Sequence, residues 1–455
     1  MVELPQGVVW GAATASFQIE GDRAGRGDTI WDAFCRVPGA VADGTDGDTT
    51  CDHVHRYRED VALLADLGVD AYRFSVAWAR VQPTGRGDFS AEGLGFYDRL
   101  VDELLGAGIE PWVTLYHWDL PLELQHTGGW ASRRTVDAFV EYALGVQDAL
   151  GDRVKRWATH NEPWCAAWLG HGSGVHAPGI RDHALAARAT HHLLLSHGRA
   201  VAAMRRQDPD AAYGIVLNLD TARAGDGSDE ARAALPLYDA VRNTVWLDPL
   251  AGRGYPEDAV SLLHPHLAGA VEPGDLEQIA TPLDWLGLNY YNDAVFEAGE
   301  GAVPTVELVQ PGLELVRQVD PGDAGTAMGW PITPDGLTDV LVRLQEEYPV
   351  LGPVVVTENG SAWDDDPAAG PDGVVEDPRR VEYLHAHLAA LQAARDRGVD
   401  VRGYFAWSLL DNFEWALGLS KRFGIVRVDF DTLERTPKRS YLAYRDAIAA
   451  ARADA

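Results

Sequence analysis

The stretch RWATHNE (156–162) is a short β-like run that ends in two polar side chains, Asn161 and Glu162. Seven other short apolar runs along the chain are β-like in the same way. They are VVWGAATA (8–15), AYRFSVAW (71–78), PWVTLYHW (111–118), YGIVLNLD (213–220), WLGLNYY (285–291), VVVTENG (354–360) and RGYFAWSLLD (402–411). The chain therefore contains eight candidate strands.

Helical patterns lie between these runs. GLGFYDRLVDELLGAG (93–108) and RRVEYLHAHLAALQAARDRG (379–398) both end in glycine, as a helix C-cap would. Near-continuous apolar strands that alternate with helices indicate a parallel sheet covered by helices. Eight such units predict an α/β fold of the (β/α)₈ barrel type rather than a doubly wound open sheet.

No clear linker interrupts the alternation, so we expect residues 1–455 to form a single domain with a barrel core at about 8–450. Three segments rich in Gly, Asp and Pro are expected to be long loops. These segments are 20–58, 221–245 and 293–335. The third follows the sixth candidate strand, so we expect it to overhang the C-terminal face of the barrel.

The composition narrows the classes of partner. The chain carries 69 acidic and 38 basic residues, for a formal charge of −31. Nucleic acids and anionic membranes both need a positive protein surface, so neither is expected as a partner. No run approaches the roughly 18 apolar residues of a membrane span. We expect a small-molecule substrate instead.

The cysteines and the N-terminus bear on the compartment. Cys35, Cys51 and Cys165 are odd in number and widely spaced, which fits neither a disulfide framework nor a zinc site. Cys165 lies near Glu162, but no base beside it suggests a thiol nucleophile. The N-terminal stretch has no Lys or Arg before its apolar part, whereas a signal peptide begins with a positively charged segment. These features predict a cytoplasmic protein.

Polar and aromatic side chains gather at the ends of the candidate strands, where a barrel of this type has its active site. One such residue alone could simply begin a loop, but amide, imidazole, carboxylate and indole groups together are typical of a sugar site. Hydroxyls need donors and acceptors, and a pyranose ring stacks on an indole. The residues are Gln18, Arg73, His117, Asn161, Glu162, Asn289, Tyr291, Glu358, Trp407, Glu414 and Trp415.

Two glutamates, Glu162 and Glu358, would face each other from the fourth and seventh strands. Glycosidases use such a pair, at about 5–5.5 Å in retaining enzymes and about 6.5–9.5 Å in inverting ones, and these residues alone leave both open. Burial and the neighbouring carboxylate should raise the pKa of Glu162. We expect Arg73 to pair with Glu358 and Tyr291 to donate a hydrogen bond to it.

Eight motifs, in order, resemble those of glycoside hydrolase family 1, the β-glucosidase family, from residue 8 to about residue 445. They are WGAATASFQIEG (10–21), YRFSVAWAR (72–80), TLYHWDLP (114–121), WATHNEP (157–163), LGLNYY (286–291), VTENG (356–360), WSLLDNFEW (407–415) and KRFGIVRVD (421–429). The resemblance implies a retaining mechanism with Glu162 as acid/base and Glu358 as nucleophile. It implies no cofactor and no metal.

The resemblance also implies which residues bind substrate. Gln18, His117, Asn161, Trp407, Glu414 and Trp415 would hold the non-reducing sugar. Trp118, Asn289, Trp330 and Phe423 complete the expected substrate-binding set, with Trp330 on the aglycone side. Two branches of the family fit poorly. Myrosinase-like members lack the acid/base glutamate that this chain keeps, and 6-phospho-glycosidases replace Glu414, whose charge would repel a phosphate.

The expected reaction is hydrolysis of terminal β-D-glucosyl residues from cellobiose-type or aryl β-glucosides, which suits a role in cellulose degradation. A β-galactosidase, a β-fucosidase or a transglycosylase would use the same residues. A non-catalytic sugar-binding protein would be favoured only if either glutamate were replaced. The sequence leaves open whether the chain forms a homo-oligomer.

Overall fold

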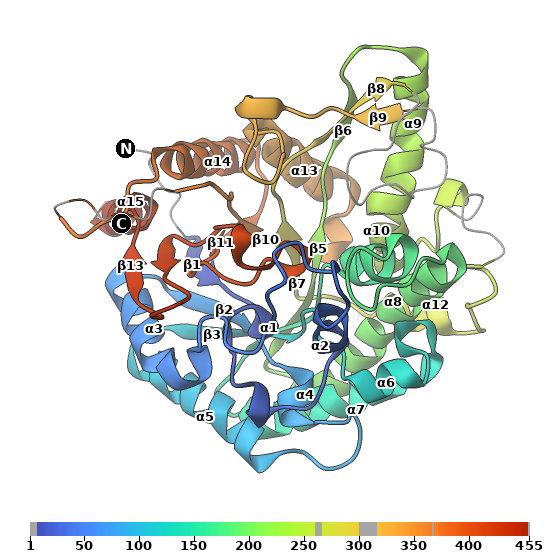
Figure 1. The fold of residues 1–455 in the computed structure, drawn as a ribbon. Helices are drawn as coiled ribbons and strands as arrows, with labels where there is room; N and C mark the ends of the chain where they lie inside the picture. The colour runs from blue at the N-terminus through green and yellow to red at the C-terminus, as the bar shows by residue number, and fades with distance from the viewer. Residues whose placement is uncertain are drawn as a thin grey trace.

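The computed structural model describes residues 7–259, 266–299, 316–365, 368, 370 and 372–453. Eight strands form one closed barrel, and each overlaps one of the eight apolar runs (Figure 1). The strands are β1 (Val9–Ala13), β2 (Ala71–Ser75), β3 (Glu110–Tyr116), β4 (Arg156–Asn161), β5 (Ala212–Asn218), β7 (Trp285–Asn289), β10 (Val354–Asn359) and β11 (Val401–Trp407).

The barrel closes between its first and last strands. The order around it is β1-β11-β10-β7-β5-β4-β3-β2, and each neighbouring pair is parallel. Ala13 lies opposite Trp407 on one side and Arg73 on the other. The prediction of a (β/α)₈ barrel rather than an open sheet is confirmed. All eight strands therefore end at the same mouth.

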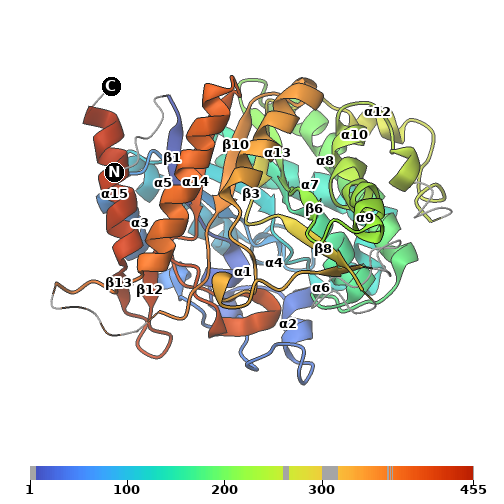
Figure 2. The same cartoon turned by 90° about the horizontal axis from the view of Figure 1, so that it is seen from above.

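Helices surround the barrel (Figures 1 and 2). The two helical patterns form α5 (Ala91–Gly106) and α14 (Pro378–Asp396), and Gly108 and Gly398 follow them with φ of 76° and 89°, as left-handed helix ends. Within the described ranges, no helix is both long and apolar enough to cross a membrane. The outer helices are α3 (His53–Leu67), α5 (Ala91–Gly106), α7 (Arg133–Leu150), α8 (His183–Gln207), α13 (Pro334–Glu347), α14 (Pro378–Asp396) and α15 (Arg439–Ala453).

Shorter elements lie in the loops between these units. The short helices are α1 (Ser16–Ile19), α2 (Ile30–Cys35), α4 (Trp78–Val81), α6 (Leu122–His126), α10 (Val245–Leu250) and α12 (Asp275–Ile279). Two strands, β12 (Val426–Val428) and β13 (Arg435–Pro437), form an antiparallel pair near the C-terminal end of the chain.

The barrel interior is filled by side chains rather than open. Trp112 packs against Trp285 and Phe405, with ring centroids 5.2 Å apart in both cases. These rings belong to one cluster that takes a buried residue from each of the eight strands. A filled interior leaves only the mouth for chemistry. The eight residues are Ala13, Ala71, Trp112, Ala158, Val216, Trp285, Val355 and Phe405.

A small sheet extends from the mouth beyond β5 and β7. It consists of β6 (Ala222–Ala224), β8 (Ala294–Ala298) and β9 (Val316–Gln318). The expectation of a loop at 221–245 is wrong for α9 (Asp229–Asp239), which packs beside this sheet. Pro236 inside the helix argues against helix locally. The apolar face of the helix packs against Phe296, and this tertiary contact outweighs the proline.

A buried ion cluster ties α3 to β13. Arg435 Nε and Nη2 donate to the two Asp60 oxygens at 2.9 and 3.1 Å, and His53 Nδ1 lies 2.8 Å from Oδ2. Burial alone would raise the pKa of Asp60, but the hydrogen bonds and charges of His53 and Arg435 hold it below its ordinary value. The cluster therefore depends on the cation staying in place.

Arg435→Met should destabilise the fold by about 3–5 kcal/mol, because it leaves the Asp60 charge buried without its cation. The measurement is the unfolding midpoint in denaturant, followed by circular dichroism. Arg445→Met is the matched control, since its exposed pair with Asp66 should contribute less than about 1 kcal/mol. Equal losses in the two variants would contradict the expected role of the buried pair.

Candidate active site

The two glutamates lie at the same end of the barrel. Glu358 is part of β10, and Glu162 follows β4 directly. Both are buried, with 2% and 6% of their surface exposed. Glu162 has a φ of 44°, in the left-handed region that is unfavourable for residues with a side chain. Its N–H donates to Val216 O and its carbonyl accepts from Cys165 N, each at 2.9 Å, and these bonds hold the turn in place.

Glu358 is bound by a cation and a phenol. Arg73 Nη1 donates to Oε1 at 2.6 Å, and the Tyr291 hydroxyl donates to Oε2 at 2.6 Å. Both contacts favour the ionised carboxylate, and the one from Arg73 is charge-assisted. The structure thus brings together three residues that the sequence places on different strands or loops.

Glu162 has different partners. Asn289 Nδ2 donates to Oε1 at 2.7 Å, and the Cys165 thiol donates to Oε2 at 3.1 Å. Thr357 Oγ1 donates to Asn289 Oδ1 at 2.7 Å, which orients the amide so that its N–H groups face Glu162. Over the described part of the chain, no charged group donates a hydrogen bond to Glu162.

Asn161 links the two carboxyl groups. Its Oδ1 accepts from Arg73 Nη2 at 2.7 Å and from Asn289 Nδ2 at 3.0 Å. Arg73 also binds Glu358, and Asn289 also binds Glu162. The Asn161 side chain therefore fixes the Arg73 guanidinium, which binds Glu358, relative to the Asn289 amide, which binds Glu162.

Burial raises the pKa of both glutamates. For Glu358 it rises to about 7, where the Arg73 guanidinium opposes the shift and the charge of Glu162 adds to it. For Glu162 the hydrogen bonds from Asn289 and Cys165 oppose the effect of burial. Because each charge perturbs the other, the two carboxyls titrate as a pair.

The buried polar atoms that lack a partner within the described residues include three from the predicted sugar-binding set: Gln18 Oε1, His117 Nδ1 and Glu414 Oε2. Gln18 Nε2 is already used, because it donates to Asn412 Oδ1 and to Phe413 O at 2.9 Å. Burial raises the pKa of Glu414 to about 8, and the charges of Glu358 and Glu162 add to this shift. Buried polar atoms without partners are costly, and a polar ligand would satisfy these.

The hydrogen bond at Nε2 of His117 determines which tautomer the ring adopts. Asn161 Nδ2 lies 3.0 Å from His117 Nε2, and the amide donates because Arg73 binds its oxygen. Nε2 is then the acceptor, and the ring proton is on Nδ1. Burial holds the pKa of His117 well below its ordinary value, so the ring is neutral. It offers one N–H donor to a ligand.

Tryptophans form one wall of the site. The rings of Trp407 and Trp415 each stack on His117 with centroids 5.8 Å apart. Trp118 packs against Trp415 at 4.5 Å, and its indole N–H donates to Asn161 O at 2.9 Å. Its N–H is thus already used within the protein. Trp118 therefore contacts both Asn161 and Trp415.

A second aromatic group lies on the Glu358 side. Tyr291 packs against Trp330 at 5.4 Å and against Phe423 at 6.0 Å. Trp330 is half-buried. In the same region of the chain, Lys421 Nζ donates to Ala327 O at 2.7 Å. The structure therefore joins Trp330 and Phe423 to the Glu358 side through Tyr291.

Sequence reasoning missed several residues that hold the site. Cys165 gave no sign of a nucleophile, and burial raises the pKa of its thiol well above the ordinary value, so it stays a thiol. Its position three residues after Glu162 was the available signal. Asn412 accepts from Gln18 Nε2, and the charge of Arg242 lowers the pKa of Glu162; in both cases the partner is distant in sequence.

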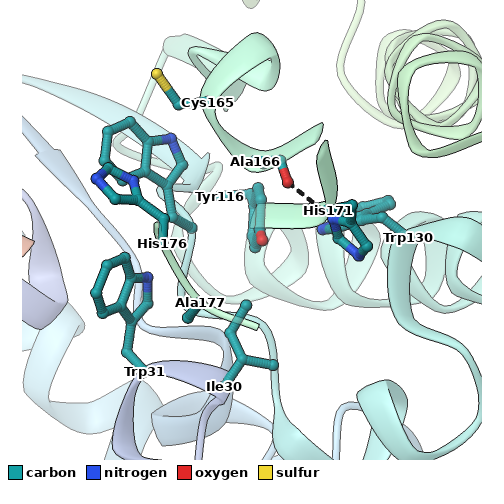
Figure 3. Close-up of a pocket in the computed structure, with 10 residues that line it drawn as sticks. Ile30, Trp31, Tyr116, Trp130, Cys165, Ala166, His171, His176 and Ala177 are labelled. Atoms are coloured by element: carbon teal, nitrogen blue, oxygen red, sulfur yellow. Dashed lines mark hydrogen bonds between the residues drawn. The ribbon is translucent and has the colours of Figure 1, made fainter. Parts of the chain in front are cut away.

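A small pocket lies beside the carboxylate pair rather than at it. It is lined by indole and imidazole groups, including Trp31, Trp130, His171 and His176, and Cys165 lies at its upper edge (Figure 3). In the part of the chain that is described, no group of three or more His, Cys, Asp or Glu side chains could hold a metal ion.

Comparison with known proteins gives a consistent result. The model of glycosyl hydrolase family 1 matches residues 1–453. The thermostable beta-glucosidase B of Thermobispora bispora is 48% identical, over 98% of this chain and 91% of its own length. A bifunctional beta-D-glucosidase/beta-D-fucosidase of Bifidobacterium breve is 44% identical over 98% of both chains.

The solved structures give the same result. The crystal structure of a psychrophilic beta-glucosidase from Micrococcus antarcticus superposes with a TM-score of 0.93. It is 46% identical in sequence and covers 98% of this chain and 97% of its own. The family resemblance noted from the motifs is confirmed. The chain belongs to glycosyl hydrolase family 1.

Proposed function

We propose that the chain is a retaining β-glucosidase that releases terminal non-reducing β-D-glucosyl residues from cellobiose-type or aryl β-glucosides. One observation carries this proposal: two buried glutamates share one mouth but have different hydrogen-bond partners. Glu358 is bound by Arg73 and Tyr291, and Glu162 by Asn289 and Cys165. Different partners suit the two carboxyls to different tasks.

The different partners support an assignment of the shared proton to one of the two glutamates. A guanidinium and a phenol stabilise the ionised form of Glu358, whereas only neutral donors bind Glu162. The proton of the pair therefore resides on Glu162. Glu358 is the nucleophile, and Glu162 is the acid.

The reaction then proceeds in two displacements. A Glu358 oxygen attacks the anomeric carbon as Glu162 gives its proton to the glycosidic oxygen, and the bond to the aglycone breaks. In the second step water attacks the same carbon, Glu162 takes a proton from that water, and the bond to Glu358 breaks. Two inversions leave the β configuration.

The unpaired atoms of the site suit a sugar. Gln18 Oε1 and Glu414 Oε2 accept from hydroxyls, and His117 Nδ1 donates to one. Asn161 would bind the 2-hydroxyl, a contact that strengthens in the transition state. Trp407 and Trp415 offer indole faces to the ring. Trp330 and Phe423 would contact the aglycone side, and Glu414, once ionised above its raised pKa of about 8, would repel a phosphorylated sugar.

The activities for which the relatives are named support a glucoside as substrate. The Bifidobacterium breve relative is named for both glucosidase and fucosidase activity, which favours a β-fucoside as a second substrate. We also place the enzyme in the cytoplasm. Cys35, Cys51 and Cys165 are all free thiols, which fits a reducing compartment.

The first product released from p-nitrophenyl β-glucoside should be β-glucose, because two inversions restore the configuration. Proton NMR of the anomeric signal, recorded before mutarotation, measures this directly. The same assay with the β-fucoside and β-galactoside ranks the three sugars, and we expect the glucoside or the fucoside to rank first. Initial release of α-glucose would contradict the retaining mechanism.

A further inference from the structure

Cys165 contacts the carboxyl group of Glu162 through a turn that the backbone closes. Cys165 begins a π-helical segment, Cys165–Ser173, and its N–H donates to Glu162 O at 2.9 Å. This bond folds the chain back so that Sγ lies 3.1 Å from Glu162 Oε2. Cys165 is 5% exposed, so solvent does not compete for the thiol. The thiol is a built part of the environment of Glu162.

A second acceptor lies on the other side of the sulfur. The amide of Asn218 is 3.4 Å from Sγ. With its carbonyl toward Arg242, it accepts from Nη1 at 2.8 Å and from Nη2 at 3.1 Å. Asp220 holds that guanidinium, because its Oδ2 accepts from Arg242 Nε at 3.0 Å. The Asn218 carbonyl is therefore held beside the thiol.

The hydrogen bonds of Glu162 favour one position for its proton. Asn289 Nδ2 donates to Oε1, and the Thr357 hydroxyl keeps that amide in this orientation. This donor disfavours an acid proton on Oε1 and favours one on Oε2, the oxygen that faces Cys165. The thiol hydrogen can rotate, and it meets a different acceptor in each protonation state.

We propose that Cys165 is a positioning residue for Glu162: its thiol donates to Oε2 when Glu162 is ionised and turns to the Asn218 carbonyl when Glu162 is protonated. The carboxyl then keeps one orientation while it acts as acid and as base. This inference rests on the role of Glu162 given under the proposed function. A thiol suits the task because it is a weak donor that leaves the carboxyl basic enough for the second step.

Other charged or titratable groups also face Glu162. Burial raises its pKa most, the Cys165 hydrogen bond lowers it, and the cations of Arg242 and Arg73 lower it further. Glu358 and Glu414 are the neighbouring carboxyls, and the Tyr291 hydroxyl also lies near. A substitution at position 165 leaves all these groups in place, so its effect isolates the thiol.

Two variants should move the alkaline limb of the kcat/KM profile in opposite directions. Cys165→Ala removes a donor that favours the ionised form of Glu162, so the pKa of the alkaline limb should move to higher pH by about 0.5 unit. Cys165→Ser supplies a stronger donor, so the pKa of the alkaline limb should move to lower pH. Both profiles are measured with an aryl β-glucoside, and circular dichroism checks folding. A purely structural role would change the rate without opposite shifts.

Cys51 provides the matched control. Its buried thiol donates to the carbonyl of Asp411 at 3.1 Å, so Cys51→Ala should leave the limb unchanged. Glu162→Gln separates the two proposals. If that variant keeps the limb, the proposed role of Glu162 fails. If it removes the limb but both Cys165 variants leave it unmoved or shift it in one direction, only the role of Cys165 is overturned.

Discussion

Glu358→Gln is expected to lower kcat for p-nitrophenyl β-glucoside by about 10⁴-fold or more, as the loss of a nucleophile does. The amide has nearly the shape of the carboxylate but carries no negative charge to attack the anomeric carbon. It also cannot accept hydrogen bonds on both sides, so the Arg73 guanidinium or the Tyr291 hydroxyl loses its acceptor. Steady-state rates on purified protein measure the effect.

A second substitution at this position reports stereochemistry. Glu358→Gly leaves space on the face opposite the leaving group, where added azide can attack the anomeric carbon once. A single inversion gives α-glucosyl azide, identified by NMR. Glu277→Gln, on an exposed site of α12, is the control and should keep full activity. Full activity in Glu358→Gln would overturn the assignment of the nucleophile.

Glu162→Ala should separate substrates by their leaving groups. Proton donation contributes about 10²–10⁴-fold to such reactions, so cellobiose should lose a factor in this range in kcat/KM. A dinitrophenyl glucoside needs little protonation and should keep most of its first-step rate. Its glycosyl-enzyme should accumulate, because no base activates water, and a burst of phenolate measures that accumulation.

Azide should rescue this variant with the opposite stereochemistry. Attack on the glycosyl-enzyme is the second inversion, so the product is β-glucosyl azide rather than the α-azide of Glu358→Gly. In the wild type, rising pH removes the proton from Glu162 and the rate falls, because burial raises the pKa of this acid but does not abolish its ionisation. Glu162→Gln should remove that alkaline limb. A limb that persisted would require another acid.

The sequence predicted the barrel because the signal is local and repeated. Each strand is a short apolar run buried on both faces, and each helix pattern ends in a glycine that adopts positive φ, as Gly108 and Gly398 do. Strand ends of a parallel barrel meet at one mouth, so the polar residues that follow the runs could be collected as one site. The expected loop at 221–245 failed where α9 tolerates Pro236.

The sequence by itself determined the strand order in the chain, the residues at the mouth and the two glutamates, since all of these follow from local patterns and motifs. Only the tertiary structure decided which donor binds which carboxyl. Arg73 and Glu358 are 285 positions apart, and they meet because barrel closure brings strands β2 and β10 to one mouth. Asn289 meets Glu162 because β7 and β4 flank β5 in the barrel. Proton placement depends on these long-range partners, because hydrogen bonds and nearby charges set the pKa of a buried carboxyl.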